Sequence, residues 1–201
     1  MHNLRKIKLT KQFKITALKK AQEALIGMKL PKLDSGNIGR LVEQVLEEVG
    51  YKLNKGAGPD LPQWEVEIKS TVWPTHSARS IGLMSFDDIV NTSYENSLIY
   101  KKLQQQFVVK HCRTTMVITE AKMYDFRDSE IQAKFKDAYE STRSILATYQ
   151  PGHYPKEVKV KDKSGYWEHK NSNSFQFRIQ PAAMKKIEQH VDAEKARSIL
   201  F

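Results

Sequence analysis

Three residues between positions 56 and 70, Asp60, Glu67 and Lys69, have the types and spacing of a site that hydrolyses phosphodiesters. Apolar and charged residues alternate from Trp64 to Lys69, and this alternation predicts a strand with Glu67 and Lys69 on the same face. Glycine and proline residues just upstream predict a bend at Asp60. A bend that folds back would bring Asp60 to Glu67 and Lys69.

Two carboxylates beside an ammonium suit metal-assisted hydrolysis. Mg²⁺ is usually held by one or two carboxylates, so Asp60 and Glu67 are the predicted ligands, and Mn²⁺ can substitute. Lys69 is predicted to orient or activate the attacking water. The alternative is a half-buried strand whose charged face is solvated, with no catalytic role.

The best-defined helix is predicted between Ser35, a suitable N-cap, and Gly50, a suitable residue just past the C-terminus. Its apolar stripe consists of Ile38, Leu41, Val42, Val45, Leu46 and Val49. Glu43 lies off this stripe, one turn beyond Gly39. By its position alone, Glu43 is a surface acid.

A capping box at 92–95 predicts a helix that runs to about Phe107 and carries Lys101 and Lys102. Strands are predicted at 81–86, 114–119, 157–161, 165–169 and 174–180, and further helices from Ser129 and from Pro181. In the last strand Gln176 and Arg178 share the face opposite to Phe175, Phe177 and Ile179.

These elements predict an α/β fold with one central mixed sheet, built from the strand pair around residue 70 and the 114–119 strand, with helices on both faces. A chain of 201 residues is enough for one compact domain. We expect a basic helical arm over 1–34 and a catalytic core over 35–201.

The net charge of +10 indicates a polyanionic partner, nucleic acid first and an anionic membrane surface second. No acid precedes Glu23, so three roles are open for the arm: it could lie along phosphates, be a solvated basic helix or be an organellar presequence. No stretch is apolar enough for a membrane span or a secretory signal, and Cys112 is the only cysteine. We expect a cytoplasmic, nucleoid-associated protein that binds double-stranded DNA and no membrane.

Four separated segments together resemble one family. They are Pro59-Asp60 with Glu67-Ile68-Lys69, GNIGRLVEQVLEE at 36–48, YENSLIYKKL at 94–103 and FQFRIQPAAMKK at 175–186. In this order they resemble the MutH-like PD-(D/E)XK endonucleases, which include mismatch-repair nicking enzymes and related type II restriction enzymes. The resemblance implies a restriction-endonuclease-like fold, a metal-facing Glu43, a Lys102 near the scissile phosphate and an Arg178 in the recognition surface. The further DNA contacts that we expect are Gln176, Arg79 and Lys101.

Two classes of function follow. The first is a Mg²⁺-dependent, sequence-specific double-stranded DNA endonuclease, either a type II restriction enzyme or its nicking subunit, or alternatively a strand-nicking repair enzyme. The second is a basic DNA-binding module without catalysis. The protein partners expected for the first class are a second nuclease subunit, a homodimer partner or a repair partner.

Overall fold

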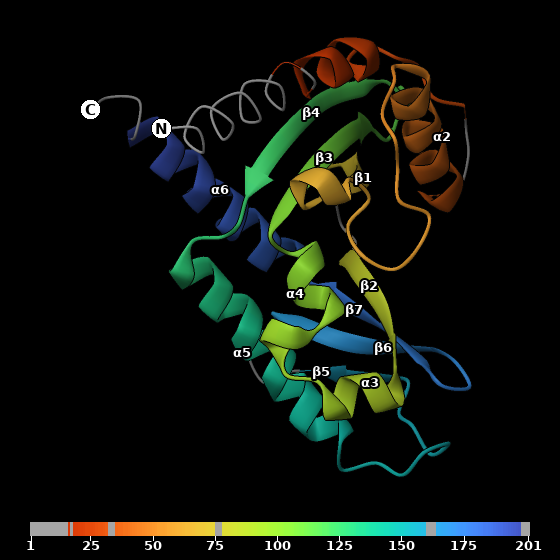
Figure 1. Ribbon diagram of the computed structural model, residues 1–201, viewed down its shortest axis with the longest axis vertical. Helices are drawn as coiled ribbons and strands as arrows, with labels where there is room; N and C mark the ends of the chain where they lie inside the picture. The colour runs from red at the N-terminus through yellow and green to blue at the C-terminus, as the bar shows by residue number, and fades with distance from the viewer. Residues whose placement is uncertain (1–15, 17, 32–34, 75–77, 160–163, 198–201) are drawn as a thin grey trace, which may run out of the picture. The chain divides into compact units, whose positions relative to one another are not determined.

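The structure is a computed structural model that describes residues 16, 18–31, 35–74, 78–159 and 164–197. The predicted basic residues before position 16 and His76 lie outside the described residues. The fold is α/β, as predicted, and the chain forms two compact units (Figure 1). The first comprises the described residues of Met1–Pro74 and Gln106–Met123, and the second those of Thr75–Gln105 and Tyr124–Phe201.

The first unit contains a three-stranded sheet in the order β1-β3-β4 and the helix α2. Its elements are α2 (Ser35–Glu48), the 3₁₀ helix η1 (Pro62–Trp64), β1 (Val66–Trp73), β3 (Gln105–Cys112) and β4 (Ile118–Asp125). The predicted helix is confirmed, and four residues of its apolar stripe are buried: Ile38, Val42, Val45 and Leu46. They pack with Val66 and Ile68 of β1 in one core, which places α2 against β1.

The described part of the predicted arm contributes to this core. Residues 18–25 are helical, and their apolar side chains Leu18, Ala21 and Leu25 are buried in the same cluster as α2 and β1. Lys19 and Lys20 of this helix are exposed. Residues 18–25 therefore stabilise the first unit through an apolar face and present basic side chains to solvent.

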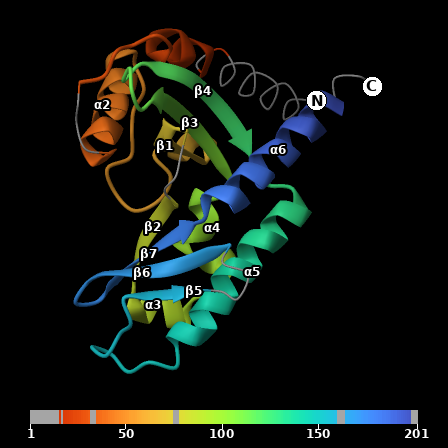
Figure 2. The same cartoon turned by 180° about the vertical axis from the view of Figure 1, so that it is seen from behind.

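The second unit is built on a four-stranded antiparallel sheet in the order β2-β7-β6-β5. Its elements are β2 (Arg79–Ser85), α3 (Phe86–Asn91), the 3₁₀ helix η2 (Tyr94–Asn96), α4 (Leu98–Lys102), α5 (Ser129–Leu146), β5 (Glu157–Lys159), β6 (Gly165–Asn171), β7 (Ser174–Ile179) and α6 (Pro181–Arg197). Figure 2 shows α5 lying along this sheet, in agreement with its packing against β5 and β6.

Alternation in β7 holds as predicted: Phe175, Phe177 and Ile179 are buried, and Gln176 and Arg178 are on the other face. The buried face packs in an aromatic core. Phe177 contacts Trp167 of β6 at 5.0 Å between ring centroids and Tyr139 of α5 at 5.9 Å. Burial of these large rings is the main favourable term for α5 on the sheet.

The single central sheet predicted from the sequence is divided between two sheets. The strand before Pro74 pairs within β1-β3-β4, whereas the strand after it pairs with β7. Proline cannot donate to a strand ladder, and Ile81 and Met84 of β2 are buried in the second unit with Phe175 and Phe177. The apolar side chains of β2 therefore pack with those of β7, and β2 belongs to a different sheet from β1.

The helix predicted from the capping box at 92–95 to about Phe107 is wrong over most of its length, and only Leu98–Lys102 is α-helical. The capping box opens only the 3₁₀ turn η2, after which Ser97 Oγ accepts from the backbone N–H of Tyr100 and begins the short helix α4. β3 starts at Gln105 and is almost entirely buried up to Val109. A strand buried on both faces has no alternation, so its apolar run resembles a helix in sequence.

The predicted strand at 114–119 is displaced. Residues before Met116 form the turn between β3 and β4, closed by the Met116 backbone N–H donating to the Cys112 carbonyl at 2.9 Å. Met116 itself has a left-handed φ of 57°. The β-forming composition predicted a central strand over 114–119, but only its last two residues belong to β4, which begins at Ile118.

The helix predicted from Ser129 is confirmed as α5, although its N-cap is Asp128, whose carboxylate accepts from the backbone N–H groups of Glu130 and Ile131. Pro181 begins α6, as predicted. Within the described residues, no helix has the length and apolar character that a membrane crossing requires.

Candidate metal and nuclease site

The chain folds back immediately before β1, as the predicted bend requires. Pro62 begins η1, and Glu65 adopts a left-handed φ of 54°, so that Leu61 and Val66 pair through both backbone groups. The strand therefore starts at Val66, and Trp64 and Glu65 are not part of the alternation. The reversal carries Asp60 alongside β1.

Asp60 is attached to β1 by its carboxylate. The backbone N–H of Ile68 donates to Asp60 Oδ2 at 2.7 Å. This bond places one carboxylate oxygen of Asp60 beside the strand position that follows Glu67. The predicted convergence of Asp60 on the Glu67–Lys69 segment is thus present in the fold.

Glu67 is buried, with a relative exposure of 2%, although it belongs to the charged half of the alternation. Its neighbours Val66 and Ile68 are buried on the opposite face. A solvated charged face, the alternative for this strand, is therefore wrong at Glu67. Burial of a carboxylate costs free energy unless its charge is compensated, so Glu67 is not at this position to make the surface soluble.

Lys69 compensates part of this charge. Its Nζ lies 2.7 Å from Glu67 Oε1, and its side chain is 20% exposed. Side chains two residues apart on a strand share a face, so the pair follows directly from the spacing in sequence. An ammonium is held at the border between the buried carboxylate and solvent.

Glu43 reaches this group from α2. Burial raises the pKa of the Glu43 carboxyl, the carboxylates of Asp60 and Glu67 raise this pKa further, and Lys69 opposes them. Gly39, one turn earlier, lies over β1, and a Cβ placed there would make an ordinary 3.5 Å contact with Ser70 Oγ. The structure therefore brings Glu43, Asp60, Glu67 and Lys69 together within the first unit.

The donor chemistry fits a hard divalent cation. Mg²⁺ takes oxygen ligands and is usually held by one or two carboxylates, with water and substrate phosphate completing the octahedron. Among the described residues, no three His, Cys, Asp or Glu side chains are arranged to ligate a common ion. Asp60 and Glu67 are therefore the candidate pair of carboxylate ligands, and Glu43 is a further acid near them.

We expect Glu43→Gln to raise the melting temperature in metal-free buffer at pH 7.5. A raised carboxyl pKa means that the folded state holds the Glu43 proton more tightly than the unfolded state does. Stability is therefore lost as pH rises through the folded pKa, and a neutral amide avoids that loss. In a chain of this size each kcal/mol of stability gained would raise the melting temperature by about 2–4 °C.

The control is Glu48→Gln, which changes an exposed acid at the end of the same helix. Thermal unfolding followed by circular dichroism in EDTA checks this prediction. An unchanged or lower melting temperature for Glu43→Gln would show that its carboxylate is not repelled by Asp60 and Glu67.

Lys102 lies in the second unit, at the end of α4. Its aliphatic stem packs over Gly82 of β2, where an added Cβ would meet Lys102 Cδ at 3.3 Å and Ile99 Cδ1 at 3.1 Å. Gly82 therefore allows α4 to lie close to β2. Lys101, its exposed neighbour, is in the last turn of the same helix.

The arginines predicted to contact DNA are engaged inside the second unit. Arg178 Nη1 lies 2.6 Å from Glu168 Oε2, and its Nη2 donates to the Ala78 carbonyl at 3.0 Å. Arg79 Nη2 lies 2.5 Å from Glu188 Oε1, with both side chains nearly buried. Gln176 is half-buried on the face of Arg178.

Glu168 was not among the residues singled out in the sequence. Lys170 and then Arg178 hydrogen-bond to its carboxylate and hold its pKa below the usual range. The residue opposite Glu168 on β7 is Gln176, and Tyr166 is opposite Arg178. This register depends on how β6 pairs with β7, so single-strand alternation could not reveal that Glu168 binds Arg178.

If Arg178 exchanges Glu168 and the Ala78 carbonyl for a guanine when DNA binds, we expect Arg178→Ala to reduce the preference for a cognate DNA site by about tenfold or more, since a bidentate arginine–guanine pair contributes about 1–3 kcal/mol of discrimination. Divalent-ion binding should not change, because Asp60 and Glu67 belong to the first unit. Competition binding with cognate and scrambled duplexes measures this ratio. Unchanged discrimination with a lower melting temperature would assign Arg178 to holding Glu168 and the start of β2.

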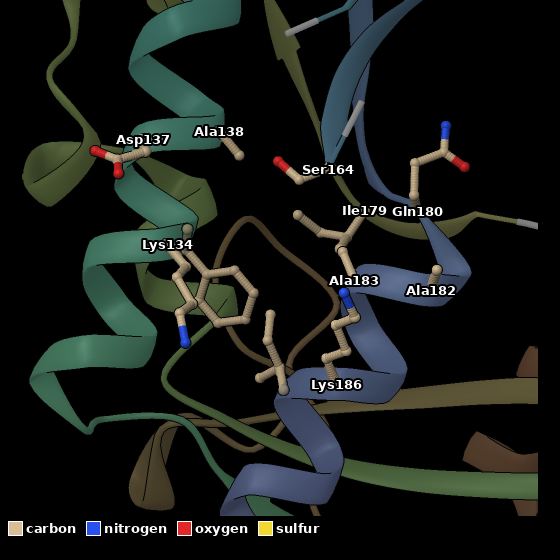
Figure 3. Close-up of a pocket in the computed structure, with 11 residues that line it drawn as sticks. Lys134, Asp137, Ala138, Ser164, Ile179, Gln180, Ala182, Ala183 and Lys186 are labelled. Carbon is tan, nitrogen blue, oxygen red and sulfur yellow. The ribbon is translucent and has the colours of Figure 1, made fainter. Parts of the chain in front are cut away.

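The second unit also contains a cavity of about 760 Å³ between α5 and the start of α6 (Figure 3). Its wall includes Phe135, Ala138, Ile179 and Ala183, with Lys134 and Lys186 among the polar residues. The residues predicted for catalysis and DNA contact are not among those that line it. The cluster of Glu43, Asp60, Glu67 and Lys69 at β1 therefore remains the candidate site.

Neither a scan against protein-family models nor a search of curated proteins finds a match for this chain.

Proposed function

We propose that the protein is a Mg²⁺-dependent endonuclease that hydrolyses phosphodiester bonds in double-stranded DNA. The observation that carries this proposal is the burial of Glu67 beside Lys69, with Asp60 and Glu43 gathered at the same strand. A strand with only a structural role gains nothing from a buried carboxylate that has a second acid, Glu43, near it. In a nuclease, the carboxylates would bind a cation and the Lys69 ammonium would contact the phosphodiester.

Asp60 and Glu67 would hold Mg²⁺ as carboxylate ligands. When bound, the ion supplies Lewis-acid chemistry, because it draws electron density from the phosphoryl oxygens and acidifies water. One carboxylate oxygen of Asp60 accepts a hydrogen bond from the Ile68 N–H, and this bond fixes the direction of the carboxylate. Glu67 is similarly oriented by Lys69.

Lys69 would act on the water and the phosphate. An ammonium has three donors, and one of them is used on Glu67 Oε1. The other two are available to hold the attacking water and a non-bridging phosphate oxygen as negative charge grows there. Hydrolysis then forms one P–O bond from water and breaks one bridging P–O bond.

The second unit would supply DNA contacts. The candidates for DNA contact are Lys101, Arg79, Gln176 and Arg178, and Lys102 is proposed as a catalytic residue that acts near the scissile phosphate. Because Arg79 and Arg178 are paired with Glu188 and Glu168, DNA contact by either arginine would have to displace or share these carboxylates. The enzyme class that we propose first is a type II restriction endonuclease or its nicking subunit, and the alternative is a strand-nicking repair endonuclease.

The test is cleavage of an unmethylated supercoiled plasmid that carries many different sites. We expect nicked or linear product with Mg²⁺ or Mn²⁺ and none in EDTA, while Ca²⁺ supports binding with little hydrolysis, since its looser coordination holds the attacking water less well. Linear product in a single step would favour restriction, and accumulation of nicked circles would favour repair.

Failure of the wild type to cut several unmethylated DNAs in any metal would favour the non-catalytic DNA-binding module. Binding itself is tested separately through its salt dependence, because log K falls with log salt by about 0.9 for each phosphate neutralised. A flat dependence between low and physiological salt would count against DNA as the partner of this basic chain.

A further inference from the structure

The segment that delivers Asp60 is an irregular loop closed by Asn54. The backbone N–H of Asn54 donates to the carbonyl of Asp60 at 2.8 Å, so the two ends of the loop are joined directly. The residues between them, Lys55 to Pro59, belong to no helix or strand. Their path must therefore be set by other contacts.

The side chain of Asn54 supplies these contacts. Its Nδ2 donates to the carbonyls of Ala57 at 3.2 Å and Pro59 at 3.3 Å, and its Oδ1 accepts from the backbone N–H of Gly56 at 3.0 Å. One amide thus bonds the main chain of three loop residues. Asparagine suits this role because it carries both donors and an acceptor on a short stem.

The two glycines of the loop lie against this amide, at distances where an added Cβ would make an ordinary contact. A Cβ at Gly56 would lie 3.4 Å from Asn54 Oδ1, and a Cβ at Gly58 would lie 3.4 Å from Asn54 Nδ2. Gly58 also has a φ of +114°, which side chains rarely adopt. Asn54, Gly56 and Gly58 form one arrangement that ends at Asp60.

Asp60 is consequently held at two points. Asn54 fixes its main chain through the backbone bond and the Pro59 carbonyl, and Ile68 fixes its carboxylate. Together these contacts fix both the main chain and the carboxylate of the proposed metal ligand. An error of about 1 Å in such a ligand is enough to weaken a metal site substantially.

We infer that Asn54 is the positioning residue for Asp60, and that its amide sets the affinity of the proposed site for divalent cations. This inference rests on the proposed function. In this inference Asn54 is not a metal ligand, because its side chain acts only through the main chain of the loop.

The experiment compares Asn54→Ala, in the full chain, with the wild type in two measurements. We expect the Mg²⁺ concentration for half-maximal plasmid cleavage to rise by about tenfold or more, the usual cost of losing a group that orients a metal ligand. Cleavage at saturating Mg²⁺ should recover toward the wild-type rate. Calorimetric titration with Ca²⁺ should show a similar loss of affinity, with DNA binding in EDTA unchanged.

Two further variants protect this test against simple misfolding. Asn54→Ser keeps an oxygen that can accept from Gly56 and removes the Nδ2 donors, so we expect an intermediate shift in Mg²⁺ requirement. Gly58→Ala disturbs the loop from its other end and should shift the requirement in the same direction. The matched controls are Asn91→Ala, which removes one exposed side-chain bond to the Asp87 carbonyl, and Gly152→Ala, at a φ of +86° with open space around it.

The outcomes separate the inference from the proposed function. If the wild type cleaves and Asp60→Asn does not, an unchanged Mg²⁺ requirement in Asn54→Ala and Asn54→Ser overturns the role of Asn54 alone. A lower melting temperature with an unchanged metal requirement does the same, since it marks a merely structural turn. If the wild type does not cleave any DNA, the proposed function fails, while a Ca²⁺ affinity lost in both Asp60→Asn and Asn54→Ala still supports Asn54 as the positioning residue.

Discussion

Lys69→Ala is expected to reduce plasmid cleavage by about 10²- to 10⁴-fold, the range for removing a group that handles the proton or charge of the attacking water. DNA affinity measured in Ca²⁺ should stay near the wild-type value, because Lys69 is one cation in a chain of net charge +10. Single-turnover cleavage and a binding assay on the same DNA measure the two effects separately.

The same substitution leaves Glu67 buried without its 2.7 Å partner. Removing one member of a buried ion pair costs on the order of 3 kcal/mol, so the melting temperature in EDTA should fall. Mg²⁺ should restore part of this stability in the variant, since the ion would replace the lost positive charge beside Glu67. Assays are therefore run well below the melting temperature of the variant.

Lys110→Ala is the matched control for Lys69→Ala. Lys110 lies on β3 in the same unit and is paired with Glu120 at 2.8 Å, but Glu120 is 41% exposed. Loss of this pair should change cleavage little, because neither residue belongs to the carboxylate group at β1. Cleavage by Lys69→Ala at the wild-type rate would refute the proposed role of Lys69.

Asp60→Asn is expected to abolish detectable cleavage. Loss of one of two carboxylate ligands removes several kcal/mol of metal-assisted stabilisation, and about 4 kcal/mol corresponds to a factor of roughly 10³ in rate. The amide can still accept the Ile68 N–H bond at Oδ1, so the loop and β1 should stay in place. DNA binding in EDTA should be unchanged or tighter, since a carboxylate that repels phosphate has been removed.

Glu65→Gln is the control for this variant. Glu65 is an exposed acid in the reversal immediately before β1, and no catalytic role is assigned to it. It should cleave like the wild type. Ca²⁺ titration of Asp60→Asn completes the test, because a Ca²⁺ affinity equal to that of the wild type would show that Asp60 is not a ligand.

Local patterns were sufficient for much of the fold. The stripe of α2, the start of α6 at Pro181 and the alternation of β7 agree with the structure because each depends on neighbours within one element. The same holds for Glu67 with Lys69, since residues two apart on a strand share a face. The fold-back at Asp60 was predictable because glycine and proline break regular structure wherever they occur.

Local patterns failed where pairing between distant segments decides the conformation. The segment before Gln105 contains a good capping box, yet it forms only η2 and α4 because the following residues are needed as the buried strand β3. The strand after Pro74 was predicted in the same sheet as the strand before it, and this was wrong, because its pairing with β7 depends on apolar residues about a hundred positions later. Tertiary packing overrides local propensity in both cases.

For the candidate site, the sequence by itself determined which residues we propose for the chemistry: Asp60, Glu67 and Lys69, with Glu43 added by resemblance. Only the tertiary structure decided their state. It buries Glu67, directs Asp60 through Asn54, and pairs Arg178 with Glu168. The reason is physical: residue types and spacing set what a side chain can do, whereas burial and partners come from segments that the chain brings together only on folding.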